Sequence, residues 1–384
     1  MKKVSVVIPT RDRAEYLQKS LQFLEAQDNK NFEVVILDNP SQESKDFECS
    51  KLRNYSFHIK YSRASRPMSM TENWNRWTHH VEGEYVCFMS DRFFLLPDAI
   101  RKIEAAIRTY DADLFNLHPM IYYPNSSGDC LEGPGHLLDN RSLRKATELY
   151  DPNEWLKELL QLHVGYLTMP PWLRSRGMVY GGVVRRRLMQ NICDKFGNLF
   201  HGLSPDYTSM VFLLHFAKTA VTIMEPLILF PNCDVGNGKQ CYQSYAVAVK
   251  FFEQTPSDIK KEIVANELVP GLRYGHSTLY SDIEICLNKL GGDLRQNWSN
   301  AFAWLLLEME GIRLGAETYP TNKKAIECFD RYVSNLSEES KLDIINATKN
   351  AKTVREKINM ERLQRIDRFE KINLRSLNDV ISMY

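Results

Sequence analysis

The chain has 384 residues, of which 43% are hydrophobic and 25% are charged, a balance typical of a globular protein with a large buried core. Lysine and arginine together number 49 and aspartate and glutamate 48, so the net charge is +1. Because no overall basic field would attract a nucleic-acid backbone, nucleic acids are not expected as partners.

Several features indicate a cytoplasmic protein. No stretch reaches the roughly 18 apolar residues that are needed to cross a bilayer. The apolar run at 4–8 is too short for the core of a signal peptide, and Pro9 ends it. The 8 cysteines include no C-x-x-C pair, which indicates reduced thiols and not a zinc site or a disulfide framework.

Strand and helix signals alternate over residues 1–100. Short β-branched or apolar runs that predict strands lie at 4–8, 32–37, 57–61 and 84–89. Leucines at helical spacing predict a helix over 14–27, and further helices are expected over 69–78 and from Pro97 onward. Strands that alternate with helices predict an α/β fold with a mostly parallel twisted sheet and flanking helices.

The alternation weakens after residue 100. Further strands are expected at 113–117, 178–184 and 222–230, with helices over 155–162 and 207–218 between them. Glycine, proline, asparagine and serine are frequent over 124–150 and 232–239, which predicts loops. From about residue 245 the pattern is helical, so we place a boundary near residue 240 and expect a helical region over 241–384.

Polar residues follow three of the predicted strands. They are Thr10-Arg11, Asp38-Asn39 and Ser90-Asp91-Arg92. Ligands of open parallel sheets bind at the carboxyl ends of the strands, so these residues are candidates for one shared site. Any one of them alone could form a turn or a helix cap, as aspartate and asparagine often do. Three at corresponding strand ends indicate a ligand site more strongly.

Three segments resemble family 2 glycosyltransferases. The segment VSVVIPTRDRAEYLQKSLQFL is similar to the start of the family, and MSMTENWNRWTHHVEGEYVCFMSDRFFLLPDAI to its central stretch. The segment VVRRRLMQNICDKFGNLFHGLSPDYTSMVFLL resembles its later, acceptor-side stretch. The resemblance covers about residues 1–240. It implies a GT-A fold in which residues 1–100 form the nucleotide-binding half and residues 101–240 the acceptor half.

The resemblance also implies roles for the first two strand ends. Pro9, Thr10 and Arg11 stand where the family lines its nucleoside pocket. Asp38 stands where the family contacts the base, and a carboxylate there suits the N–H of uracil. A UDP-sugar is therefore the expected donor.

Two residues near the helix expected over 69–78 are further candidates. Arg66, just before this helix, is a candidate for contact with the nucleotide. Asn73 would lie near the same site, or it would be a packing amide on the helix. The sequence leaves both interpretations of Asn73 open.

The acidic turn departs from the family pattern. Asp91 stands where the family holds the ribose and a divalent metal, but Arg92 occupies the position of a metal-binding carboxylate. A Mg²⁺ or Mn²⁺ ion held through a diphosphate usually needs one or two carboxylates, so a metal cofactor is in doubt. Either Arg92 itself neutralises the diphosphate, since a guanidinium matches phosphate geometry, or the site binds a ligand without catalysis.

Asp206 stands where the family has its general base. In an inverting transfer this carboxylate takes the proton of the acceptor hydroxyl. Asp206 could instead cap the helix expected from residue 207, and one side chain can do both. The nearby run Arg185-Arg186-Arg187 is expected to be a solvated face, with a phosphate contact by one of the three as the alternative.

The C-terminal tail has three interpretations. Between residues 341 and 384 there are ten lysines and arginines against six acidic residues, and apolar residues recur at helical spacing. Such a helix packs on its own domain, forms the seam of a homodimer, or makes peripheral contact with an anionic inner membrane leaflet. The last interpretation would suit a lipid-linked acceptor.

The sequence as a whole predicts an inverting glycosyltransferase. It would move a sugar from a nucleotide-sugar, expected to be a UDP-sugar, to a glycan or lipid-linked acceptor in surface polysaccharide synthesis. The alternative is a non-catalytic nucleotide-sugar-binding protein with a degenerate metal site. A nucleotidyltransferase is disfavoured, because it would need a glycine-rich basic loop where Pro9-Thr10-Arg11 stand.

Overall fold

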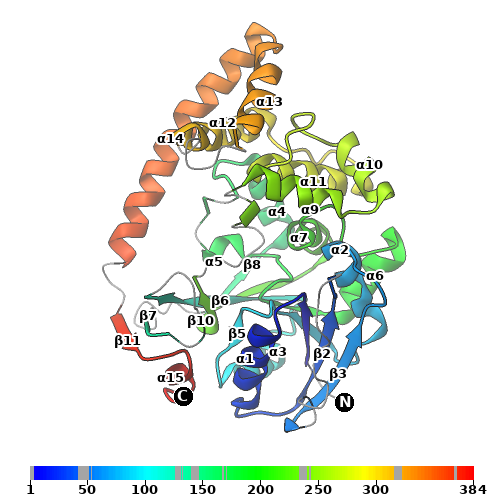
Figure 1. The fold of residues 1–384 in the computed structure, drawn as a ribbon, viewed down its shortest axis with the longest axis vertical. Coiled ribbons are helices and arrows are strands. Elements are labelled where there is room, and N and C mark those ends of the chain that lie inside the picture. Colours follow the sequence, from blue (N-terminus) through cyan, green and yellow to red (C-terminus); the bar gives the residue numbers. More distant parts are fainter. Residues whose placement is uncertain are drawn as a thin grey trace.

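The computed structural model describes residues 4–41, 52, 54–125, 131, 133–139, 147–166, 168–169, 171–232, 240–241, 244–314, 322–366 and 370–384. A twisted sheet flanked by helices forms one part of the molecule, and helices from the later part of the chain are stacked on one end of it (Figure 1). Apart from its first residue, the loop expected at 232–239 lies outside the described residues.

The described residues form the following elements. The strands are β1 (Val4–Thr10), β2 (Phe32–Asp38), β3 (His58–Arg63), β4 (Tyr85–Phe88), β5 (Phe94–Leu95), β6 (Leu114–Pro124), β7 (Gly135–Asp139), β8 (Glu148–Tyr150), β9 (Gly182–Arg185), β10 (Ala220–Pro231) and β11 (Glu370–Leu374). The helices are α1 (Ala14–Glu25), α2 (Met70–Asn75), the 3-10 helix η2 (Arg76–His79), α3 (Ala99–Tyr110), α4 (Pro152–Gln161), α5 (Pro171–Arg174), α6 (Arg186–Phe196), α7 (Pro205–Phe216), α9 (Tyr245–Glu253), α10 (Ser257–Ala265), α11 (Gly275–Leu290), α12 (Trp298–Leu314), α13 (Lys323–Ser334), α14 (Glu338–Ile366) and α15 (Asn378–Ile381).

The strands join in one sheet whose main path runs β11-β7-β6-β9-β4-β1-β2-β3. The part built from residues 1–100 is parallel, because β1 pairs in parallel with β2 and β4, and β2 with β3. Beyond β4 the strand β9 runs antiparallel to both β4 and β6, while β10 is parallel to β6. The predicted α/β class with flanking helices is therefore confirmed.

Alternate residues of β1 face opposite layers of the fold. Val4, Val6 and Ile8 pack in one buried cluster with α1 and α3. Val7 packs in another cluster, with Trp74 at α2 and residues of α4, α6 and α7. A strand that is buried on both faces has a continuous apolar sequence, which is the pattern of residues 4–8. Both faces of the sheet are thus covered by helices, which leaves the ends of the strands as the place for a ligand site.

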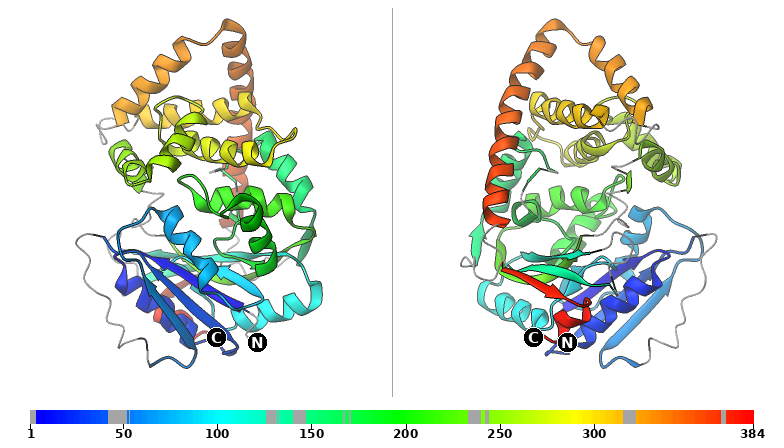
Figure 2. Two further views of the ribbon diagram at one scale, coloured as in Figure 1. Left: turned by 90° about the vertical axis from the view of Figure 1, so that its right-hand side faces the viewer. Right: turned by 60° about the vertical axis from the view of Figure 1, so that its left-hand side comes forward.

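The helices after residue 240 share the core of the sheet part. Tyr280 of α11 and Trp304 of α12 belong to the same buried cluster as Val7 of β1. The predicted C-terminal helical region is confirmed for α9 to α14. The end of the chain differs from the prediction of helices alone. After α14, which runs along the side of the molecule, the strand β11 pairs antiparallel with β7 at the edge of the sheet (Figure 2). The alternation of apolar Ile372 and Leu374 with polar neighbours suits this edge position.

Two other expectations were wrong in detail. The region 124–150, predicted as loops, contains β7 and β8, which are only 5 and 3 residues long and therefore leave a weak alternation signal. Helix α7 begins at Pro205, two residues earlier than expected, because proline is favoured in the first turn of a helix.

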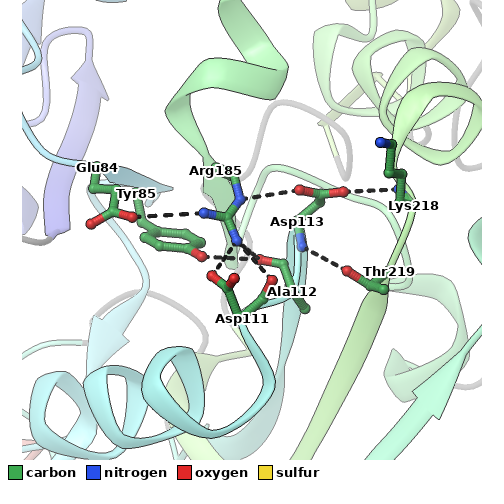
Figure 3. Close-up of polar contacts among 8 residues, drawn as sticks. All are labelled: Glu84, Tyr85, Asp111, Ala112, Asp113, Arg185, Lys218 and Thr219. Carbon is green, nitrogen blue, oxygen red and sulfur yellow. Dashed lines mark hydrogen bonds and ion pairs between the residues drawn. The ribbon is translucent and has the colours of Figure 1, made fainter.

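Arg185 is the last residue of β9 and lies where β4 and β6 begin, at the end of the strands opposite the candidate site (Figure 3). Its guanidinium binds Asp113 at 3.1 Å, Asp111 at 2.6 Å and Glu84 at 3.6 Å. Burial lowers the pKa of Arg185, but the hydrogen bond with Asp111 and the nearby negative charges outweigh burial, so the pKa is raised. Arg185 is therefore a clamp between β9, β4 and β6, and the alternative of a phosphate contact does not hold for it.

Replacing Arg185 with alanine should destabilise the fold. The variant leaves three carboxylates without their shared cation, and we expect the free energy of unfolding to fall by roughly 2 kcal/mol, between the values for exposed and buried ion pairs. Urea denaturation measures this change. Arg187→Ala, at an exposed position of the same run, is the matched control and should unfold like the unmodified protein. Equal midpoints for the two variants would contradict the clamp.

Candidate active site

Thr10, Asp38 and Asp91 meet at the carboxyl ends of β1 and β2 and in the turn after β4. In the register of the parallel strands, Thr10 lies opposite Asp38. The Thr10 hydroxyl Oγ1 donates a hydrogen bond to Asp91 Oδ2 at 2.8 Å, across 81 residues of sequence. The strand ends that were expected to share one site are therefore neighbours.

Asp91 is a buried carboxylate surrounded by hydrogen-bond donors. Only 1% of its surface is exposed. Besides Thr10, the Ser90 hydroxyl donates to Asp91 Oδ1 at 3.2 Å, and Arg13 Nη1 lies 3.4 Å from the same oxygen. The backbone N–H of Arg92 donates to Ser90 Oγ at 3.2 Å, which closes the turn. Arg13, which sequence reasoning did not single out, is thus the cation paired with Asp91.

The residues around Asp91 do not fit a divalent cation. Both carboxylate oxygens accept hydrogen bonds, and one of them faces the guanidinium of Arg13. Mg²⁺ and Mn²⁺ need several oxygen ligands, and the position next in sequence is a second arginine, Arg92. Within the described ranges, no three acidic, histidine or cysteine side chains gather as metal ligands.

Asp38 is oriented by the neighbouring strand β3. The Tyr61 hydroxyl donates to Asp38 Oδ2 at 2.6 Å, and Arg63 Nη1 donates to the same oxygen at 2.7 Å. Only 6% of the surface of Asp38 is exposed. These contacts hold the carboxylate at the carboxyl end of β2. Its contact with a nucleotide base stays a prediction.

Asn73 and Arg66 lie in different surroundings. Asn73 is buried, its Nδ2 donates to the backbone oxygen of Leu37 at 3.0 Å, and its Oδ1 accepts from Arg76 at 2.7 Å. The amide thus fastens α2 to β2, as the packing interpretation requires. Arg66 is exposed and pairs with Glu72 of α2 at 2.8 Å. For both residues, contact with a nucleotide stays a prediction.

Pro9 and Arg11 flank Thr10 in the chain. Pro9 lies inside the sheet, paired with Leu37 of β2. Arg11 reaches the helices beyond residue 240, where its Nη1 donates to Gln254 Oε1 at 3.1 Å, just after α9. Arg11 also lines a cavity of about 10 Å³, room for about one water molecule, between the start of α2, the loop before α7 and the end of α9.

Asp206 lies in the first turn of α7. The helix begins at Pro205 and its N-cap is Ser204, so Asp206 lies inside the first turn and does not occupy the cap position that the capping interpretation proposed; the backbone N–H groups of Asp206 and Tyr207 act to lower its pKa. Burial raises the pKa of Asp206 to about 6, although these N–H groups and the charge of Arg174 act in the opposite direction. A carboxylate with this pKa is ionised at neutral pH and still binds a proton readily.

Tyr180 connects Asp206 with the acidic turn. Its hydroxyl is hydrogen-bonded to Ser90, and burial raises its pKa to about 12, with the charges of Arg92, Asp91 and Asp206 also acting on it. Its ring packs against Trp74, 5.4 Å between centroids, and Phe93, 4.9 Å. Sequence reasoning missed Tyr180 because it stands in a run, 178–184, that was interpreted only as a strand.

Charges of both signs act near the acidic turn. Guanidinium groups of Arg13 and Arg92 lie in and beside the turn of Asp91, where they can bind an anion such as a phosphate. The charge of Asp206 also acts on Tyr180, and this carboxylate can accept a proton. The site can therefore stabilise an anionic leaving group and deprotonate a nucleophile.

No helix in the described part of the chain is both long and apolar enough to cross a membrane.

Residues 5–134 match the family model described as glycosyl transferase family 2. The GalNAc(5)-diNAcBac-PP-undecaprenol beta-1,3-glucosyltransferase of Campylobacter jejuni is 29% identical over 101 residues, which cover 26% of this chain and 33% of that protein. Glycosyltransferase GlyA of Streptococcus pneumoniae is 23% identical over 134 residues, 33% of this chain and 19% of that protein. The chain thus spans about a third or less of these relatives.

Solved structures show weaker similarity. Residues 1–349 of TarS from S. aureus, in complex with UDP-GlcNAc, align with a TM-score of 0.46 and 15% identity over 95% of this chain and 88% of that one. The mannosyltransferase PcManGT from Pyrobaculum calidifontis, in complex with GDP-Man and Mn²⁺, aligns with a TM-score of 0.41 and 12% identity over 91% and 86% of the two chains. These values are too low to transfer a ligand or a metal.

The family match covers the strand ends that carry Thr10, Asp38 and Asp91, together with the parallel α/β sheet that positions them. Residues 5–134, which carry these strand ends, are therefore similar to glycosyl transferase family 2.

Proposed function

We propose that this protein is an inverting glycosyltransferase that moves a sugar from a UDP-sugar to a glycan or lipid-linked acceptor in the synthesis of a surface polysaccharide. The observation that carries the proposal is Asp206, a partly buried carboxylate with a raised pKa whose charge, like those of Asp91 and Arg92 in the acidic turn, acts on Tyr180. The family match of residues 5–134 supports it.

The donor would bind along the carboxyl ends of β1, β2 and β4. The nucleoside would lie against Pro9, Thr10 and Arg11, with the uracil N–H donating to the Asp38 carboxylate. Asp91 would meet the ribose. A diphosphate carries negative charge, which Arg13 and Arg92 can neutralise, and charge-assisted hydrogen bonds of this kind are among the stronger ones in proteins.

The reaction would be a single displacement at the anomeric carbon. Asp206 takes the proton of the acceptor hydroxyl while the hydroxyl oxygen forms a bond to C1 of the sugar. The bond between C1 and the diphosphate oxygen breaks, and its electron pair leaves with UDP. Because attack and departure occur on opposite faces of C1, the anomeric configuration inverts.

The proposed acceptor rests on the C. jejuni relative, whose name describes a glucosyl transfer to a glycan linked to undecaprenol diphosphate. We extend the proposal to the cytoplasm and to peripheral contact with the inner face of a membrane. Exposed apolar side chains on α14 are compatible with such contact: Leu342, Ile345, Met360 and Leu363.

A second candidate is a nucleotide-sugar-binding protein without catalysis. The observation in its favour is the single carboxylate of the acidic turn, Asp91, which is already paired with Arg13. Both candidates bind the donor, so only turnover distinguishes them.

Replacing Asp206 with asparagine should remove sugar transfer and leave donor binding intact. The amide keeps the shape of the carboxylate but cannot take the proton, and loss of a general base costs about 10²–10⁴ in rate. The measurement is UDP release from a panel of UDP-sugars with a polyprenyl-diphosphate-linked glycan as acceptor, together with calorimetric titration of UDP.

Asp194→Asn, at an exposed position of α6, is the matched control and should turn over normally. A wild-type protein that binds UDP but transfers sugar from no donor would favour the non-catalytic candidate. An Asp206→Asn variant with more than about half of the wild-type rate would show that Asp206 is not the base and serves only the first turn of α7.

The rate should depend on pH through Asp206. A base acts in its ionised form, so the transfer rate should be constant above the pKa of about 6 and fall tenfold for each pH unit below it. Initial rates between pH 5 and 8 measure this limb. The residual rate of Asp206→Asn should lack it, and an unchanged limb in that variant would assign the titration to another group.

Donor binding should depend little on divalent metal. Arg92→Ala should weaken UDP by about tenfold or more and uridine hardly at all, because only UDP carries the diphosphate that Arg92 would meet. Calorimetric titration of both ligands, first with EDTA and then with Mn²⁺, measures this. Arg187→Ala serves as the control for a lost surface arginine. A large gain in UDP affinity of the unmodified protein on adding Mn²⁺ would contradict the arginine mechanism.

A further inference from the structure

We propose that Asp282, on α11 in the C-terminal helical region, is a positioning residue that fixes the loop 202–204 and thereby the place of Asp206 at the start of α7. The inference rests on the proposed function, in which Asp206 is the base. Asp282 touches neither the strand ends nor the acidic turn, and it acts through the loop.

The contacts between Asp282 and the loop are direct. Asp282 has 0% of its surface exposed. Its Oδ1 and Oδ2 accept from the backbone N–H of Leu203 at 3.0 and 3.1 Å, and Oδ2 accepts from the backbone N–H of Ser204 at 2.7 Å. Ser204 is the residue immediately before α7, and its side chain also hydrogen-bonds Asp282. The carboxylate therefore holds the last residues before the helix that carries Asp206.

Gly202 shows how closely the carboxylate and the loop approach each other. Its φ is +58°, a conformation that residues with a side chain rarely adopt. A Cβ at this position would lie 2.2 Å from Asp282 Oδ1, so a side chain there would displace the carboxylate. The backbone oxygen of Gly202 also accepts from Thr71 Oγ1 of α2 at 2.7 Å. The loop is thus held from the sheet side by α2 and from the helical side by α11.

Holding a loop with a buried carboxylate costs free energy, because burial disfavours the ionised form. Burial raises the pKa of Asp282 to about 7. The charge of Asp206 also raises this pKa, and the hydrogen bonds from the loop N–H groups lower it. Within the described ranges, no lysine, arginine or histidine forms an ion pair with Asp282. An ionised carboxylate can accept from Leu203 and Ser204 at once, which an amide cannot do with its nitrogen.

Other titratable groups face this carboxylate pair. They are Arg174 of α5, Tyr180 before β9, Tyr207 of α7 and Cys286 of α11. The charge of Arg174 lowers the pKa of Asp206, and the charge of Asp206 raises the pKa of Asp282. Because the pKa of Asp282, about 7, lies above that of Asp206, about 6, Asp282 is mostly protonated where Asp206 titrates, so replacing Asp282 should leave the acid limb of the rate profile in place.

The test is the full-length Asp282→Asn variant with three measurements. Amide hydrogen exchange should become faster at 202–206 and stay unchanged in β1 and β2. The value of kcat should fall by about 10- to 100-fold because the base is displaced, while the Kd for UDP stays within about twofold. The acid limb of kcat should stay near pH 6, because Asp206 remains the base.

Glu284→Gln, on the same helix and bonded to Gln296, is the matched control and should change none of these values. If Asp282→Asn fails to fold, Ser204→Ala removes one donor to Asp282 and should give a smaller fall in kcat with the same local increase in exchange.

Unchanged exchange at 202–206 in Asp282→Asn would overturn the inference, as would altered exchange with a kcat equal to that of Glu284→Gln. If the wild-type protein transfers sugar from no donor, the proposed function fails and the assignment of Asp282 to a base fails with it. The exchange measurement then still decides whether Asp282 orders the loop.

Discussion

The parallel pairing of β1 with β2 and β4 is the constraint on which the candidate site depends. Parallel strands in register bring their carboxyl ends to one edge of the sheet, so Thr10, Asp38 and Asp91 become neighbours. The hydrogen bond from Thr10 to Asp91 ties β1 to the turn after β4, and Tyr61 and Arg63 of β3 orient Asp38 in the same way. A shift of one residue in register would turn these side chains to the opposite faces.

Residues of the C-terminal helical region contact segments close to the candidate site. Asp282 of α11 holds the loop before α7, and Arg11 after β1 meets Gln254 after α9. In the proposed reaction, the arginines around Asp91 meet the leaving diphosphate, and Asp206 meets the acceptor hydroxyl. An inverting displacement requires the base and the leaving group on opposite faces of the anomeric carbon.

The elements and residues predicted from the sequence are those with a local signal. The apolar runs at 4–8 and 32–37 predicted β1 and β2, and the polar residues after them predicted where side chains would meet. Arg13 and Asp282 were missed because their partners lie far away in sequence, 78 residues for Asp91 and 79 for Leu203. Tertiary packing also decided that the Asn73 amide fastens α2 to β2 and that β11 joins the edge of the sheet.

Stabilisation by nucleotide tests the position of the donor site most directly. The full-length protein is unfolded in urea with and without UDP at about 100 times its Kd, a concentration that should raise the free energy of unfolding by about 2.7 kcal/mol. Thr10→Val and Asp38→Asn each alter one strand end and should lose most of this gain, whereas Arg187→Ala should keep it. If UDP adds no stability, or if the strand-end variants gain as much as the unmodified protein, the donor does not bind at the carboxyl ends of β1 and β2.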